Sequence, residues 1–275
     1  MIPAVAATPK SDPIFWLSGG PGGAATEDFG WTPALFSLLH ADRDFVMVDQ
    51  RGTGGSHRLV APTAPDTSGL SDDAAAATIK AWLAATLAEM DGDPRFYTTS
   101  VAMDDLDLVR AALGYDQINL YGVSYGATAA QYYLRQHEDR VRTAVLDGAT
   151  LLDVPVFERI APNTQRALDL LFDRCDTSAV CAGPYPGLRA EFAAVLARVT
   201  KDPVTTIVTR PSTSQPVVID RSTFAGSVHL LLMNAQSAAG LPKYIHAAYG
   251  GDFDPLAIAA VGAMGDDTSQ LVMST

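Results

Sequence analysis

Residues 117–126 of the chain read QINLYGVSYG, and this stretch decides the fold. Its first part, residues 117–122, is a short apolar run that is typical of a buried strand. The rest, Gly122–Gly126, matches the pattern GxSxG, in which a very tight turn leads from a strand into a helix and leaves a serine hydroxyl exposed. Residues 125–137 have a helical pattern, and the amides at the start of such a helix favour negative charge developing beside Ser124. The sequence therefore predicts Ser124 as a nucleophile.

Similar apolar runs recur through the first half of the chain. They predict three more strands, at residues 13–17, 44–49 and 141–147. Helical stretches at about 73–90 and 100–113 lie between the predicted strands. Strands that are apolar throughout and alternate with helices indicate an α/β fold with a parallel sheet covered on both faces. Ligands of such sheets bind beyond the carboxyl ends of the strands, where the glycine-rich loops of this chain fall.

Two glycine-rich segments follow predicted strands. Leu17–Gly23 (LSGGPGG) can present a backbone N–H to a substrate oxyanion, and with the amide of Tyr125 it would complete an oxyanion hole. A nucleotide-binding loop does not fit there, because no GK[ST] follows and the GxGxxG spacing is absent. In the second segment, Asp49–Ser56 (DQRGTGGS), we expect Asp49 and Arg51 to pair and to brace the loops beside the site.

The motifs GGPGG, DQRGTGGS and GVSYGA, in this order, resemble the proline iminopeptidase and tripeptidyl aminopeptidase family of α/β hydrolases. The segments at 145–148 and 175–186 also resemble the tripeptidyl-aminopeptidase-like branch. The resemblance covers most of the chain and implies an α/β-hydrolase core with a mostly parallel sheet, followed by a mostly helical cap. It further implies a nucleophile at Ser124 and oxyanion donors near Gly20 and Tyr125. The implied reaction releases N-terminal residues from peptides, or hydrolyses small amides or esters.

The character of the sequence changes after about residue 150. Helical patterns follow at residues 157–174, 188–199, 222–234 and 241–249. Residues 203–220 form one possible hairpin. We therefore expect a hydrolase core at residues 1–150 and a cap region at residues 151–275. Measured against the family pattern, the chain is expected to be truncated at both ends, with an incomplete cap and without the C-terminal strands of the core.

A nucleophilic serine needs a base, and the base needs an orienting acid. In this fold the chain order is Ser, acid, His, and the resemblance implies that the acid and histidine lie on loops after the cap. We therefore expect both to be missing, and no histidine of the chain stands out as a substitute; the five are His40, His57, His137, His229 and His246. His40 and His137 are expected at or near helix ends, facing solvent. Asp147 ends the strand after the nucleophile and fits a structural role better than an orienting one.

Three hypotheses stay open at this point. The first is a serine hydrolase of the aminopeptidase type, with a carboxylesterase of the same fold as its variant. The second is a catalytically incomplete fragment or a binding-only protein that lacks the triad acid and histidine. The third is a half-protein, completed by a second chain or by self-association through an exposed apolar sheet edge. The reactivity of Ser124 discriminates the first from the second.

Composition narrows the partners and the compartment. The net charge of −12 argues against a nucleic-acid partner, because phosphate binding needs a basic surface. No apolar run is long enough to cross a membrane, the N-terminus lacks a signal-peptide pattern, and no motif indicates a metal or an organic cofactor. Cys175 and Cys181, separated by five residues, can form a disulfide or stay reduced. A disulfide would indicate an exported or periplasmic protein, and free thiols a cytoplasmic one.

Overall fold

The computed structural model describes residues 1–30, 33–67, 70–209 and 214–264. These residues form two compact units. One runs from Met1 to Val154 and is called the sheet unit here, and the other starts at Pro155 and is called the helical unit. In the ranges that the structure describes, no helix is both long and apolar enough to cross a membrane.

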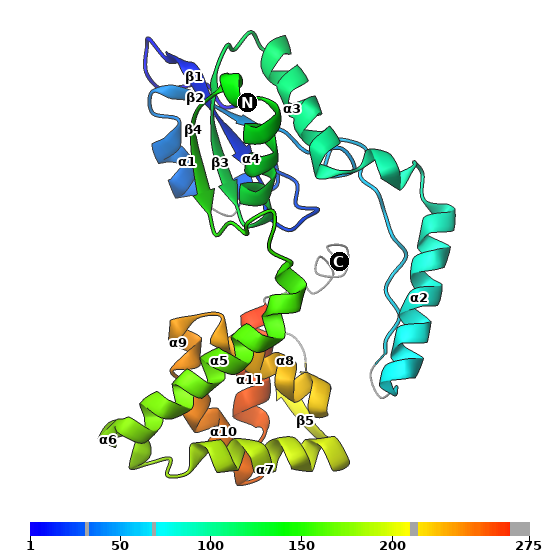
Figure 1. Ribbon diagram of the computed structural model, residues 1–275, viewed down its shortest axis with the longest axis vertical. Coiled ribbons are helices and arrows are strands. Elements are labelled where there is room, and N and C mark those ends of the chain that lie inside the picture. The colour runs from blue at the N-terminus through cyan, green and yellow to red at the C-terminus, as the bar shows by residue number, and fades with distance from the viewer. Residues whose placement is uncertain (31–32, 68–69, 210–213, 265–275) are drawn as a thin grey trace. The chain divides into compact units, whose positions relative to one another are not determined.

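The sheet unit is built on a parallel sheet whose four described strands lie in the order β2-β1-β3-β4 (Figure 1). Their bounds confirm the four predicted strands to within a few residues: β1 (Lys10–Leu17), β2 (Arg43–Met47), β3 (Ile118–Val123) and β4 (Val141–Asp147). Side chains of β1 alternate between two buried clusters, with Phe15 and Leu17 in one and Trp16 in the other. Both faces of the sheet are therefore apolar, as the continuous apolar runs predict.

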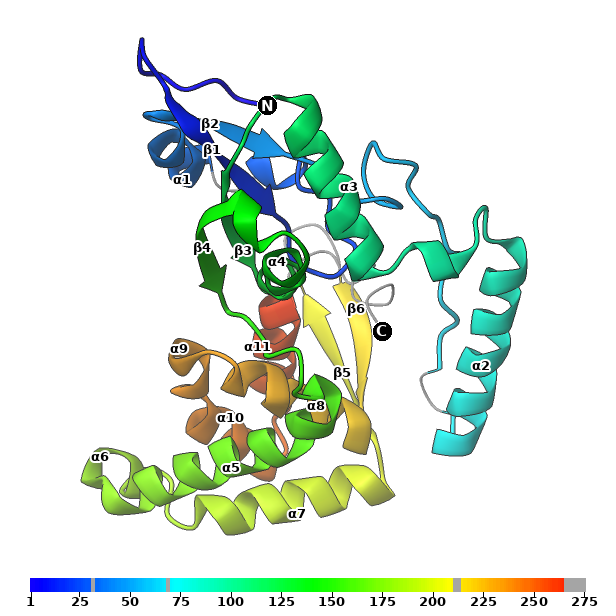
Figure 2. The ribbon, with the colours of Figure 1, turned by 45° about the horizontal axis from the view of Figure 1, so that its top comes forward.

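Helices cover both faces of this sheet (Figure 2). On one face α3 and α4 pack together, and on the other Phe36 of α1 contacts the rings of Trp16 and Phe45. The helices and 3₁₀ turns of this unit are η1 (Asp28–Gly30), α1 (Pro33–Leu39), α2 (Asp72–Glu89), η2 (Pro94–Phe96), α3 (Thr99–Ala112), α4 (Tyr125–Gln136) and η3 (Glu138–Arg140).

The two edge strands of the sheet differ in what covers them. At β2, Ile2 forms a bridge to Phe45 through two backbone hydrogen bonds of 2.8 Å. At β4, which the described residues pair with β3 alone, Val145 and Leu146 are 47% and 40% exposed. The edge at β4 is thus apolar and open to solvent within the sheet unit, and association through it stays a prediction.

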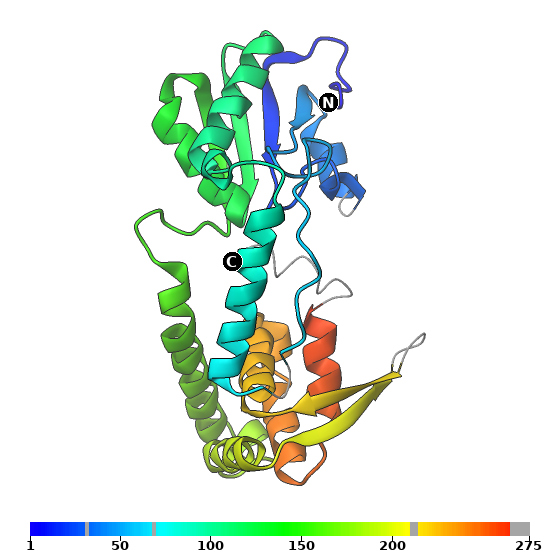
Figure 3. The same cartoon turned by 90° about the vertical axis from the view of Figure 1, so that its right-hand side faces the viewer.

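The helical unit contains the antiparallel strand pair that the sequence predicts and a set of packed helices (Figure 3). A disulfide joins Cys175 at the end of the first long helix to Cys181 in the short helix after it. Phe172, Val195 and Phe224 belong to the buried core of this unit. Its elements are α5 (Val156–Thr177), α6 (Ala179–Ala182), α7 (Leu188–Lys201), β5 (Val204–Thr209), β6 (Ser214–Ile219), α8 (Arg221–Leu232), α9 (Ala235–Ala238), α10 (Leu241–Tyr249) and α11 (Asp254–Met264).

Candidate active site

Ser124 forms the turn between β3 and α4. Its backbone has φ 55° and ψ −119°, a region that residues with a side chain rarely adopt. The Ser124 N–H donates to the carbonyl oxygen of Asp147 at 2.8 Å, and the Ser124 carbonyl oxygen accepts from the N–H of Ala127 at 3.0 Å. Hydrogen bonds on both sides therefore hold this conformation, and the side chain is left exposed to solvent.

Two glycines make the tight turn sterically possible. A Cβ atom on Gly122 would lie 2.3 Å from the carbonyl oxygen of Gly126. A Cβ atom on Gly126 would lie 2.0 Å from the carbonyl oxygen of Leu17. Both obstacles are backbone atoms, so only glycine fits at either position. The register pairs Leu17 with Gly122, and the first turn of α4 consequently rests on the end of β1.

The loop that follows β1 passes beside Ser124. A Cβ atom placed on Gly19 would lie 3.3 Å from Ser124 Cβ and 3.8 Å from Ser124 Oγ. Gly20 has φ +119°, and the N–H of Gly23 donates to the Gly19 carbonyl oxygen at 3.3 Å. The loop with Gly20 and the start of α4 with Tyr125 therefore both lie next to the serine. Their roles as oxyanion donors stay a prediction.

Asp49, just after β2, joins two loops. Its Oδ1 accepts from the N–H and the hydroxyl of Thr26 at 2.9 and 3.0 Å, and its Oδ2 accepts from the N–H of Gly55 at 2.9 Å. Burial alone would raise the pKa of Asp49, but these hydrogen bonds and the nearby charge of Arg58 hold it below its ordinary value. The carboxylate is therefore ionised at neutral pH and ties the loop after β1 to the loop after β2.

The predicted pairing of Asp49 with Arg51 is wrong. Arg51 instead binds both carboxylate oxygens of Asp105 in α3, through Nε and Nη2 at 2.6 Å each, and donates to the carbonyl oxygen of Phe96 at 2.8 Å. The carboxylate of Asp49 already accepts hydrogen bonds from Thr26 and Gly55, and the guanidinium of Arg51 binds Asp105 in the middle of α3 instead. The two residues still brace the loops, each toward a different neighbour.

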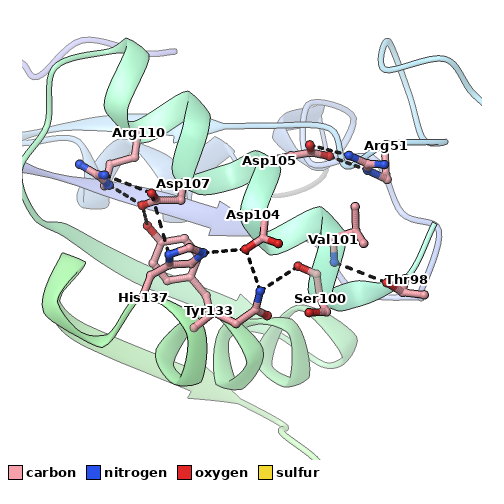
Figure 4. Close-up of polar contacts among 11 residues, drawn as sticks. Arg51, Thr98, Ser100, Val101, Asp104, Asp105, Asp107, Arg110, Tyr133 and His137 are labelled. Atoms are coloured by element: carbon pink, nitrogen blue, oxygen red, sulfur yellow. Dashed lines mark hydrogen bonds and ion pairs between the residues drawn. The ribbon is translucent and has the colours of Figure 1, made fainter. Parts of the chain in front are cut away.

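The sequence predicts that His40 and His137 face solvent, but both are partly buried, so this prediction is wrong. His137 packs against Tyr133 with ring centroids 4.9 Å apart, and its Nε2 lies 3.1 Å from Asp104 Oδ1 (Figure 4). Tyr133 donates to Asp107 at 2.8 Å in the same network. Carboxylates of α3 thus hold the end of α4, away from Ser124 at its start.

The other histidines also have partners of their own. In the sheet unit, His40 Nδ1 lies 2.6 Å from the Phe36 carbonyl oxygen, and His57 Nε2 lies 3.2 Å from Asp91 Oδ2. In the described part of this unit, no side chain hydrogen-bonds the Ser124 hydroxyl.

Two histidines belong to the helical unit. His229 Nδ1 lies 2.7 Å from Thr164 Oγ1. His246 Nδ1 lies 2.9 and 3.0 Å from the two carboxylate oxygens of Glu191, a buried residue. Glu191 thereby orients the imidazole of His246 and leaves its Nε2 on the far side of the ring.

A surface pocket adjoins the predicted oxyanion donors, since one lining residue follows Gly20 and another follows Ser124. The hydroxyls of Tyr125 and Thr99 hydrogen-bond across it at 2.8 Å. Burial raises the pKa of Tyr125, so its hydroxyl stays protonated at neutral pH. Among the residues that the structure describes, the lining contains no charged side chain; it consists of Pro21, Tyr97, Thr98, Thr99, Ser100, Tyr125 and Tyr132.

A family model described as alpha/beta hydrolase fold matches residues 12–174. The chain is 34% identical over 119 residues to the serine protease Hip1 of Mycobacterium tuberculosis. The aligned part is 42% of this chain and 23% of Hip1. The chain is 29% identical over 145 residues to the proline iminopeptidase of Neisseria gonorrhoeae, covering 52% of this chain and 34% of that protein. A solved proline iminopeptidase of Mycobacterium smegmatis matches at 17% identity and a TM-score of 0.37, over 76% of this chain and 58% of that one. The chain thus spans about a quarter to a third of the curated relatives it matches.

Proposed function

The chain belongs to the α/β-hydrolase family, and from this premise we propose that it is a serine hydrolase whose nucleophile is Ser124. The observation that carries the proposal is the backbone of Ser124, held at φ 55° between β3 and α4 with its side chain exposed. The unpaired amides in the first turn of α4 favour negative charge at this point. A strained conformation that the surrounding hydrogen bonds enforce is typical of a functional position.

The proposed reaction begins with attack of Ser124 Oγ on a carbonyl carbon. The carbonyl oxygen becomes an oxyanion and accepts hydrogen bonds from the backbone N–H groups of Gly20 and Tyr125. The serine proton passes to a base and then to the leaving amine or alcohol, and water releases the acyl group from the serine. The described sheet unit presents no histidine to Ser124, so the identity of the base is a question for experiment.

Two substrate classes fit the proposal. The names of the relatives, a serine protease and a proline iminopeptidase, support cleavage of peptides at their N-terminal residues or of small amides. The second class, carboxylic esters, is favoured by the pocket that Pro21 and Tyr125 line, because its described lining contains no carboxylate that could bind a substrate α-ammonium. Comparing a p-nitrophenyl ester with an aminoacyl p-nitroanilide would rank the two classes.

The decisive test is labelling of the purified chain with a fluorophosphonate probe, mapped by mass spectrometry. We expect an adduct on Ser124 that is lost in Ser124→Ala and kept in Ser178→Ala. Ser178 is the matched control because it is also an exposed serine at the start of a helix, α6. A folded chain that takes up no probe would favour the alternative reading of a catalytically incomplete, binding-only protein. If labelling occurs, Gln substitutions at His57, His229 and His246 would identify the base.

The disulfide between Cys175 and Cys181 supports an exported or periplasmic setting, because disulfides persist in oxidising compartments. We expect an alkylating reagent to leave both cysteines unmodified in chain isolated without reductant, as read from the intact mass. Alkylation of both cysteines before reduction would contradict this setting.

A further inference from the structure

The loop that carries Gly20 is fixed at two points. At its start, Leu17 is buried in the sheet and its backbone pairs with Gly122. At its far end, Thr26 is bound through both its N–H and its hydroxyl to the carboxylate of Asp49. The position of Gly20 relative to Ser124 therefore depends on the sheet and on one carboxylate.

The loop after β2 closes tightly on the same carboxylate. A Cβ atom on Gly54, which has φ +43°, would lie 2.2 Å from Asp49 Oδ2 and 2.7 Å from Ala24 Cβ. The Gly55 N–H donates to Asp49 Oδ2 at 2.9 Å. Asp49 is 9% exposed, so its hydrogen bonds form in a largely dry environment where they strongly restrain the loops. The loop after β1 and the loop after β2 are thus joined through this one carboxylate.

We propose that Asp49 is a positioning residue of the hydrolase, which holds the loop after β1 so that the Gly20 N–H meets the oxyanion formed at Ser124. This inference rests on the proposed function. Misplacement of a catalytic group by about 1 Å can lower a rate on the order of 10²-fold, so a loosened loop has a measurable effect. The side chain of Asp49 touches no reacting atom and acts through the loop alone.

The sharpest variant is Asp49→Asn, which keeps the size of the side chain. An amide can still accept from Thr26, but its NH₂ group then faces the N–H of Gly55, donor against donor. The matched control is Asp12→Asn, because Asp12 is also a partly buried carboxylate with several partners, on the strand β1. It lies toward the amino end of that strand, opposite the end that carries the loop.

Two measurements separate positioning from a general loss of stability. The first compares hydrolysis of p-nitrophenyl acetate with its thionoester analogue, whose sulfur anion gains little from N–H donors. For Asp49→Asn we expect kcat for the oxygen ester to fall on the order of 10²-fold, as after loss of one oxyanion donor, with a much smaller fall for the thionoester. Asp12→Asn should leave the ratio of the two rates unchanged. The second measurement is amide hydrogen exchange of the peptide spanning residues 18–26, which should speed up in Asp49→Asn alone.

The outcomes are distinguishable. An unchanged rate ratio in Asp49→Asn, or equal losses on both esters, would overturn the positioning role. A wild-type chain that hydrolyses neither ester and takes up no fluorophosphonate would instead overturn the proposed function. In that case the exchange measurement still decides whether Asp49 holds the loop: unchanged exchange in Asp49→Asn would show that it does not.

Discussion

The two ends of the sheet each hold a partly buried carboxylate, and the partners of the two groups differ in kind. At the amino end, Asp12 Oδ2 meets Arg43 Nε at 2.9 Å, Arg142 Nε at 2.6 Å and the amide of Asn119 at 2.9 Å. These partners come from β2, β4 and β3, so the cluster joins β1 to every other described strand of the sheet.

At the carboxyl end, Asp49 is bound by two backbone N–H groups and one hydroxyl, all from loops. A carboxylate that binds long cationic side chains fixes strands to one another and tolerates small shifts of the backbone. One that binds backbone amides fixes the conformation of the loops themselves. The same chemistry thus stabilises the fold at one end of the sheet and shapes the candidate active site at the other.

The largest effect is expected from Gly126→Ala, which disrupts the packing of α4 on β1 at the carboxyl end of the sheet. Alanine normally stabilises a helix by about 1 kcal/mol relative to glycine. Here the new Cβ atom would lie 2.0 Å from the Leu17 carbonyl oxygen, so the first turn of α4 must move off β1. We expect the free energy of unfolding to fall by about 3 kcal/mol, as in strongly overpacked sites, and labelling of Ser124 to be lost. Urea unfolding followed by far-UV circular dichroism measures the first effect.

Gly226→Ala in α8 is the matched control for that substitution. It is also a glycine inside a helix, but a Cβ atom there meets no other atom within 4 Å. The same change should therefore stabilise the chain, by about 0.5–1 kcal/mol. If both variants were stabilised alike, the close contact between α4 and β1 would be refuted.

The carboxyl end of the sheet was predicted well from the sequence, because its signals are local. Apolar runs that end in glycine mark β1 and β3, and the spacing of Gly122 and Gly126 demands a turn that the structure contains. The helices α1 and α11 escaped prediction, as did the short helices α6 and α9 and the 3₁₀ turns η1, η2 and η3. The helix α1 has only seven residues, and α11 is apolar on most sides, so neither gives a clear periodic pattern.

The contacts of Asp49 and Arg51 could not be read from the sequence, since they depend on the fold. Thr26 lies 23 positions before Asp49, and Asp105 lies 54 positions after Arg51. Because Asp49 and Arg51 are close in the sequence, a direct ion pair between them was predicted. In the folded chain each of them binds a residue that is distant in the sequence. For the same reason the partners of His137 on α3 were missed, although the helix that ends just before this histidine was predicted.

A smaller effect is expected from Asp12→Asn, which weakens the cluster of Asp12 with Arg43, Arg142 and Asn119 at the amino end of the sheet. Burial alone would raise the pKa of Asp12, but hydrogen bonds from Asn119 and Arg43 and the charges of Arg43 and Arg142 lower it to about 2 from an ordinary 3.8. A shift of this size corresponds to about 2 kcal/mol of stability at neutral pH. Because the folded pKa is depressed, this stability is fully present above about pH 4–5 and is lost as the pH falls toward 2.

The difference in unfolding free energy between wild type and Asp12→Asn should therefore be about 2 kcal/mol at pH 7 and should shrink steadily below pH 4. Tryptophan fluorescence is the right probe, because all three tryptophans of the chain precede residue 83 and report on the sheet unit. The remaining carboxylates titrate alike in both proteins and cancel in the difference. A difference in unfolding free energy that stays constant down to pH 2 would show that the two arginines and Asn119 hold β1 without depending on the charge of Asp12. In that case Asp12 would stabilise the sheet through the shape of its side chain rather than through its charge. It would then no longer differ from Asp49, which binds backbone amides, in depending on cationic partners.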